Sequence, residues 1–274
     1  MELQARYDRL KAILKELGEV LVAFSGGVDS TLLAKVAHDV LGDRAVAVTA
    51  DSPSLARREL AEAKALAEAI GMQHWIIPTH ELDDPDYAAN PENRCYFCKS
   101  ELFTRLEDLA QQRGFRWLAY GENADDGQGH RPGARAAQEF GVSAPLREAG
   151  LTKADIRALS KQLGLPTWDK AAFACLSSRF PVGSEITAEK LRQVEEAEQF
   201  LWASGFRQFR VRHHGDIARI EVGSDERLRL LDLAESIAAR LQQLGFRYTA
   251  MDLLGYRTGS TSPATAPVKW LETP

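Results

Sequence analysis

Six residues near the start of the chain have the composition of a phosphate-binding loop. They are Ser25-Gly26-Gly27-Val28-Asp29-Ser30. Two glycines let a backbone turn tightly and point successive N–H groups inward, and serine hydroxyls add further donors. A β-rich run precedes the group and a helical pattern follows it, so the positive end of a helix dipole adds to the cradle. Because the Gly-Lys-Ser/Thr ending of a Walker A loop is missing, we expect a different class of pyrophosphate site.

Three cysteines give the second chemical signal. Cys95 and Cys98 form a C-x-x-C pair, expected in a loop after the third strand, and Cys175 follows with an arginine four residues on. An odd number of cysteines argues against a disulfide framework. Three interpretations are open. The cysteines could be three ligands of a 4Fe–4S cluster with one open iron, or they could form a Cys₃His zinc site with His213 or His214. They could also be a C-x-x-C redox pair and a separate catalytic thiol at Cys175, which the nearby arginine would favour as a thiolate.

Two other groups of polar residues have the chemistry of ligand sites. In the loop that begins at Gly121, Asn123 and Asp125 could hold Mg²⁺ or a ribose, and Arg131 could neutralise a phosphate. Arg210 and Arg212 lie two apart on an expected strand, so both side chains would share one face and could clamp an anion. The alternative for these arginines is a solvated face that pairs with glutamates such as Glu221.

The pattern around these residues predicts alternating strands and helices. Strands are expected at residues 19–24, 45–49, 73–77 and 116–120. Helices are expected at residues 30–41, 55–70, 100–113 and 152–163, the last with Thr152 as its N-cap. This alternation is typical of an α/β fold in which helices wrap both faces of a parallel sheet. Ligands of such open sheets bind at the carboxyl ends of the strands. The phosphate loop and the loop that begins at Gly121 are both expected at these ends.

The pattern changes after about residue 181. Two helices, at 187–204 and 225–244, and three strands, at 209–213, 217–222 and 246–254, indicate a small α+β domain. We therefore expect the phosphate-loop domain at residues 1–181. A smaller substrate-binding or oligomerisation domain is expected at 182–274, with a poorly ordered tail from Thr258.

Composition restricts the class of protein. The chain has 274 residues, 45% of them hydrophobic, and a net charge of −5. This balance argues against a protein that coats nucleic acid. The sequence contains no run of 18 apolar residues, so we expect no membrane span. The N-terminus lacks the apolar region of a signal peptide. A cytoplasmic enzyme is the class that remains.

The phosphate loop resembles that of the PP-loop ATP pyrophosphatases, over about residues 15–165. Members of this superfamily bind ATP and Mg²⁺, cleave ATP to AMP and pyrophosphate, and attach the AMP to an oxygen of the substrate. The resemblance implies that Ser25, Gly26, Gly27 and Ser30 bind the pyrophosphate. It also implies that Asp29 is a catalytic residue that organises the pyrophosphate and its Mg²⁺.

A narrower resemblance extends over residues 5–257. The motifs Arg94-Cys95-Tyr96-Phe97-Cys98-Lys99, Ala174-Cys175-Leu176-Ser177-Ser178-Arg179 and the segment that starts at Arg210 are similar to the LarE family of ATP-dependent sulfur transferases. This resemblance implies adenylation of a carboxylate of pyridinium biscarboxylic acid mononucleotide, followed by replacement of oxygen by sulfur, in nickel-pincer nucleotide biosynthesis. It also implies a symmetric homo-oligomer. Glu122 departs from the family pattern, where a small hydroxyl residue is expected.

The source of the sulfur differs between branches of this family. In one branch the cysteine that matches Cys175 gives up its own sulfur. In the other, three cysteines hold a 4Fe–4S cluster that carries an exogenous sulfide, loaded by a sulfide or persulfide donor. Because Cys95 and Cys98 accompany Cys175 here, we favour the cluster. Two other functions of the superfamily stay open: tRNA thiolation, and amide synthesis with a structural zinc site.

Overall fold

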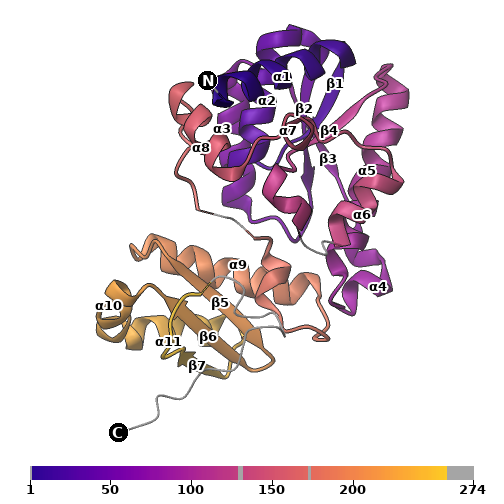
Figure 1. The fold of residues 1–274 in the computed structure, drawn as a ribbon. Coiled ribbons are helices and arrows are strands. Elements are labelled where there is room, and N and C mark those ends of the chain that lie inside the picture. The colour runs from indigo at the N-terminus through magenta and orange to yellow at the C-terminus, as the bar shows by residue number, and fades with distance from the viewer. Residues whose placement is uncertain (1, 129–131, 172–173, 258–274) are drawn as a thin grey trace, which may run out of the picture. The chain divides into compact units, whose positions relative to one another are not determined.

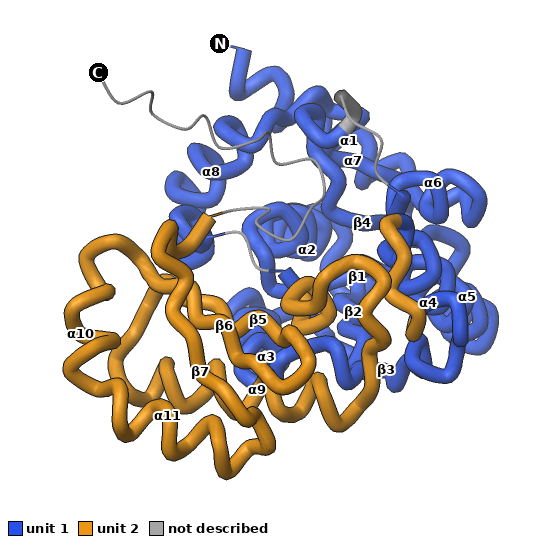
Figure 2. Tube along the Cα trace, turned by 90° about the horizontal axis from the view of Figure 1, so that it is seen from below, with its two compact units in different colours: residues 1–87, 93–174 blue, residues 88–92, 175–274 orange. Residues whose placement is uncertain are grey.

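The computed structural model describes residues 2–128, 132–171 and 174–257. The chain divides into two compact units (Figure 2). Unit 1 comprises Met1–Tyr87 and Asn93–Ala174, and unit 2 comprises Ala88–Glu92 and Cys175–Pro274. The second segment of unit 2 therefore begins at Cys175, whereas the sequence predicted a boundary near residue 181. Arg131 and the tail from Thr258 lie outside the described residues.

A parallel sheet of four strands forms the centre of unit 1 (Figure 1). The strand order is β3-β2-β1-β4, and every neighbouring pair is parallel. Parallel neighbours need crossover connections, which helices provide here. The predicted α/β fold is therefore confirmed. The strands are β1 (Val20–Ala23), β2 (Ala45–Asp51), β3 (His74–Pro78) and β4 (Leu118–Tyr120).

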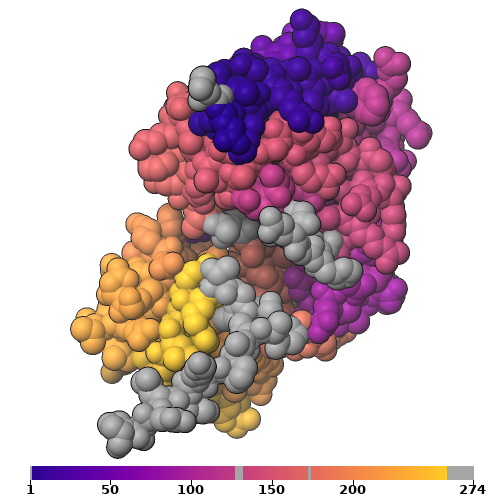
Figure 3. Space-filling model, viewed as in Figure 1, coloured from indigo at the N-terminus to yellow at the C-terminus, as the bar shows by residue number. Residues whose placement is uncertain are grey.

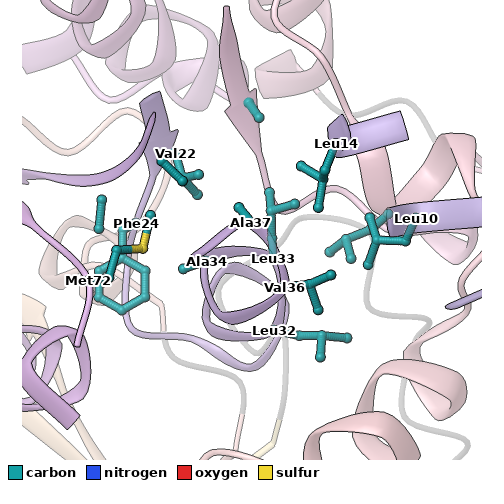
Figure 4. Packing of buried hydrophobic residues seen from close by; sticks show 14 of the residues in the cluster. Leu10, Leu14, Val22, Phe24, Leu32, Leu33, Ala34, Val36, Ala37 and Met72 are labelled. Carbon is teal, nitrogen blue, oxygen red and sulfur yellow. The ribbon is translucent and has the colours of Figure 1, made fainter. Parts of the chain in front are cut away.

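Helices cover both faces of this sheet. Side chains of adjacent strand residues point to opposite faces: Val22 packs with α1 and α2 residues, whereas Leu21 packs with α5 and α6 residues. Figure 4 shows Leu10 and Leu14 of α1 beside the apolar face of α2, and Figure 3 shows α1 (indigo) on the surface of unit 1. The helices are α1 (Glu2–Leu17), α2 (Val28–Leu41), α3 (Arg57–Ile70), α4 (Pro85–Ala88), α5 (Arg94–Arg113), α6 (Pro132–Glu139), α7 (Pro145–Glu148) and α8 (Lys153–Gln162).

Unit 2 contains a three-stranded sheet of order β5-β6-β7. β5 and β6 form an antiparallel hairpin, and β7 pairs with β6 in parallel. The core of the unit gathers Val211, Ile220 and Leu241 from the sheet and from a helix. The expected small α+β domain is therefore present. Its elements are α9 (Ala188–Ala203), β5 (Phe209–His214), β6 (Ile217–Val222), α10 (Arg227–Asp232), α11 (Ala234–Gln243) and β7 (Tyr248–Met251).

Two expectations about helices were wrong. The helix expected at 100–113 begins at Arg94, so the C-x-x-C lies in its first turn and not in a loop. The backbone N–H of Tyr96 already donates to the carbonyl oxygen of Asn93 at 2.8 Å, which starts the helix. The helix expected at 225–244 is divided at Leu233, whose ψ of 10° ends α10 before α11 begins.

Candidate active site

The phosphate loop joins β1 to α2 in a conformation that only glycine favours at Gly26. Its φ is +66°, and a Cβ there would lie 3.2 Å from Cα of Ala63 on α3. The two serines close the loop on itself: the hydroxyl oxygens of Ser25 and Ser30 are 3.1 Å apart, and the Ser30 hydroxyl donates to the Gly27 carbonyl at 3.3 Å. The tight turn predicted for these residues therefore forms locally.

The first turn of α2 is left open to an anion. Gly27 is its N-cap and offers no side-chain acceptor. The first N–H groups of a helix have no partner within the helix, and an uncapped N-terminus is a site for phosphate. At this position the loop can provide backbone donors and the helix dipole together.

The loop after β4 packs directly against this helix start. β4 pairs with β1, with Tyr120 opposite Ala23. A Cβ on the next residue, Gly121, would lie only 2.8 Å from the backbone nitrogen of Ser30. Only a residue without a side chain allows the two backbones to approach so closely. The two predicted ligand loops are therefore neighbours in space.

Within this second loop, the predicted ligand residues also hold the backbone. Asn123 accepts from the N–H of Asp125 at 2.9 Å. Asp125 in turn accepts from the N–H of Lys153, the first residue of α8, at 2.7 Å. Asn123 is 3% exposed. Both residues therefore position α8 beside the phosphate loop.

Lys153 is a site residue that the sequence analysis missed. Its ammonium nitrogen lies 2.5 Å from Oδ2 of Asp29, and the side chain is 37% exposed. The other oxygen of Asp29, Oδ1, is buried and has no hydrogen-bond partner among the described residues. A carboxylate oxygen that has no hydrogen-bond partner and lies beside a helix N-terminus is suited to bind the Mg²⁺ of a Mg²⁺–phosphate ligand. The signal that could have found Lys153 was its place directly after the predicted cap Thr152, whose capping box is present.

Glu122, the residue that departs from the family pattern, is buried and paired. Its Oε2 accepts from the hydroxyl of Tyr120 at 2.5 Å and lies 2.8 Å from Arg147. Burial and this carboxylate raise the pKa of Tyr120 well above its usual range. Glu122 therefore links the end of β4 to α7.

The C-x-x-C pair lies on the first turn of α5. Cys95 is exposed and Cys98 is half-buried, and residues three apart lie on one face of a helix. Burial lowers the pKa of Lys99, and the neighbouring thiols and Glu122 oppose that shift. Gly133 of α6 packs against this lysine, because a Cβ there would be 3.2 Å from its Cγ.

Cys175 is half-buried, and its segment is anchored by a buried arginine. Arg179 is fully buried and makes a bidentate ion pair with Glu198, both contacts at 2.9 Å. It also donates to the Cys175 carbonyl oxygen at 3.1 Å. Arg179 therefore holds the main chain at Cys175 directly.

The side chains of the three cysteines are of the type that binds iron–sulfur clusters, since such clusters are held by cysteine thiolates. Cys95 and Cys98 belong to unit 1 and Cys175 to unit 2. Across residues 2–128, 132–171 and 174–257, no group of three His, Cys, Asp or Glu side chains is arranged to hold a metal ion.

The two arginines of the predicted clamp differ in their partners. Arg212 is buried, lies 2.8 Å from Glu221 and donates to the Ser178 carbonyl at 2.9 Å. Arg210 donates to a main-chain carbonyl and packs over the ring of Tyr256. Burial, with the charge of Arg179 as a second cause, lowers the pKa of Arg210. In the described part of the chain no carboxylate forms an ion pair with Arg210, so its charge is less compensated than that of Arg212.

Comparisons with known proteins agree with this geometry. Residues 2–105 match the NAD synthase family. The pyridinium-3,5-bisthiocarboxylic acid mononucleotide synthase of Lactiplantibacillus plantarum is 41% identical over 91% of both chains. The chain belongs to the LarE family.

Other proteins are similar to this chain over most of its length. A protein of Synechocystis sp. described as uncharacterized is 48% identical over 94% of this chain and 97% of its own length. A glutamine-hydrolyzing GMP synthase component of Pyrococcus furiosus is 29% identical over 71% of this chain and 66% of its own. With the NAD synthase family match and the Lactiplantibacillus plantarum synthase, the chain is an enzyme of the PP-loop ATP pyrophosphatase superfamily. Among its described helices, none has the length and apolar character to span a membrane.

Proposed function

We propose that this LarE family member is an ATP-dependent sulfur transferase. It adenylates a carboxylate of pyridinium biscarboxylic acid mononucleotide and replaces one oxygen by sulfur. The main observation behind the proposal is the N-terminus of α2, which follows the Gly26 turn and has no side-chain cap. Lys153 forms an ion pair with Asp29 in the first turn of the same helix. These groups have the chemistry of a pyrophosphate site, and the named relative makes the corresponding thiolated mononucleotide.

The first step makes the substrate carboxylate reactive. A carboxylate oxygen attacks the α-phosphorus of ATP, and the bond to the departing pyrophosphate breaks. The loop N–H groups and Lys153 neutralise the charge that develops on the pyrophosphate. Asp29 and Asp125 are the carboxylates that would hold Mg²⁺, which lowers the negative charge on the phosphates when bound. Arg210, with Arg212, binds the phosphate of the mononucleotide.

The second step replaces the activated oxygen. A sulfur nucleophile attacks the carbonyl carbon, and the bond to AMP breaks, which leaves a thiocarboxylate. Cys95, Cys98 and Cys175 would hold three irons of a 4Fe–4S cluster, whose open iron can bind an exogenous sulfide. In the alternative route, the Cys175 sulfur attacks, forms a thioester and releases AMP. Loss of the Cα proton and cleavage of the Cβ–S bond then free the thiocarboxylate and leave dehydroalanine.

Iron and sulfide analysis of anaerobically purified protein tests the source of sulfur. We expect about four irons per chain in the wild type and loss of iron in Cys98→Ala. The Ser100→Ala variant, on the same helix, serves as control and should keep its iron. If reconstituted wild type binds no iron, the cluster is refuted. Mass spectrometry after turnover then decides whether Cys175 has lost the elements of H₂S.

Amide synthesis is the competing function, because GMP synthases are similar over much of this chain. The same adenylated intermediate would then react with ammonia. Turnover with ammonia and with sulfide as alternative nucleophiles separates the two. Formation of an amide in preference to a thiocarboxylate would contradict sulfur transfer.

A further inference from the structure

A lysine outside the recognised motifs contacts the phosphate loop. Lys170 follows α8, and its side chain is 20% exposed. Its ammonium donates to the carbonyl oxygen of Gly26 at 3.3 Å, to Glu59 at 2.9 Å and to Glu62 at 2.8 Å. Burial lowers the pKa of this lysine, but the two carboxylates raise it further, so the pKa lies above its ordinary value. The ammonium is therefore a fixed positive charge between α3 and the loop.

The contact with Gly26 sets the orientation of a loop peptide. A peptide unit is planar and trans, so its C=O and the following N–H point in opposite directions. With the Gly26 carbonyl turned towards Lys170, the N–H of Gly27 points into the loop, where the Ser25 hydroxyl lies 3.4 Å away. Close packing against Ala63 restricts the other side of Gly26. Lys170 thus holds the peptide whose N–H faces the expected phosphate.

The main chain of Lys170 is held as firmly as its side chain. Arg157 of α8 donates to the carbonyl oxygens of Trp168 at 2.7 Å and of Lys170 at 2.9 Å. The same helix begins with Lys153. The main chain and the side chain of Lys170 are therefore both fixed beside the phosphate loop.

We propose that Lys170 is a positioning residue of the phosphate loop. Its ammonium orients the Gly26–Gly27 peptide so that the loop can bind pyrophosphate. This inference rests on the proposed function, because it assumes that the loop binds the phosphates of ATP.

The test compares Lys170→Met with Lys35→Met, a control that removes an ammonium paired with Asp39 on α2. Affinity for inorganic pyrophosphate is measured by calorimetry, and KM for ATP and kcat are measured from pyrophosphate release. We expect about tenfold weaker pyrophosphate binding in Lys170→Met, the equivalent of one lost contact. We also expect a higher KM for ATP with a smaller change in kcat. Lys170→Arg should recover part of both, and Lys35→Met should match the wild type.

A second variant separates positioning from folding. Lys170→Met leaves Glu59, which is 3% exposed, with only the longer ion pair to Arg58 at 3.7 Å among the described residues, and this lowers stability. Combining Lys170→Met with Glu59→Gln removes the charge of Glu59. The double variant should recover the wild-type unfolding midpoint but not its pyrophosphate affinity. Wild-type pyrophosphate affinity and a wild-type KM for ATP in this variant would refute the positioning role of Lys170. If the wild type releases no pyrophosphate from ATP, the proposed function fails, while the calorimetry still decides whether Lys170 orders the loop.

Discussion

Gly121 is the position at which a single methyl group should disable the phosphate loop. A Cβ there would lie 2.8 Å from the Ser30 nitrogen and 3.1 Å from the Asp29 carbonyl carbon. Carbon contacts are comfortable from about 3.5 Å, so one of the two backbones must move by roughly 0.7 Å. Overpacking of this kind costs about 1–3 kcal/mol. The atoms that must yield belong to the first turn of α2, where the N–H donors for phosphate lie.

We therefore expect Gly121→Ala to weaken ATP binding by about 10- to 100-fold, since each factor of ten corresponds to about 1.4 kcal/mol. The assay is pyrophosphate release over a range of ATP concentrations, with thermal unfolding measured in parallel. Gly114→Ala is a matched control. Gly114 ends α5 with a φ of +77° and has no atoms within 4 Å of a Cβ.

The control should lose about 1–2 kcal/mol of stability from backbone strain and keep wild-type ATP affinity. Loss of affinity in Gly121→Ala alone then reports on the loop and not on general destabilisation. If Gly121→Ala binds ATP as the wild type does, α2 absorbs the methyl group without moving its donors, and the geometry described for this site is wrong.

Three further outcomes follow from two ion pairs and a buried histidine ring. Lys153→Met should weaken pyrophosphate binding about tenfold, the effect of one charge-assisted contact, and calorimetry with inorganic pyrophosphate would show an unchanged affinity if Lys153 only pairs with Asp29. Arg179→Met should destabilise the chain by about 3–5 kcal/mol, as urea unfolding would measure, because Glu198 loses its ion-pair partner and, among the described residues, keeps only the Val211 N–H as donor. Partial recovery is expected in a double variant that also carries Glu198→Leu. Burial lowers the pKa of His213 to about 4, so the unfolded chain takes up the proton first, below its ordinary pKa of about 6.5. Stability should therefore be complete above pH 6.5 and fall by about 2 kcal/mol between pH 7 and pH 5, a decrease that His213→Gln should largely remove.

The phosphate loop and the helix caps were predictable because neighbouring residues determine them. Gly26 adopts a positive φ within its own turn, and Thr152 completes a capping box with Asp155, three residues away. Alternating strand and helix patterns likewise predicted the parallel sheet. The start of α5 was missed, because a C-x-x-C carries no cap signal and the helix begins at Arg94.

The order of the strands and the pairing of distant charges depended on the tertiary structure. Lys153 meets Asp29 across 124 positions of sequence, and Lys170 meets Gly26 across 144. Arg212 finds Glu221 only because the register of β5 and β6 places their side chains within reach. The sequence by itself determined the local conformations and the chemical types available. Which of those groups meet was decided by packing of the helices on the sheet, since contacts between remote segments depend on every element that lies between them.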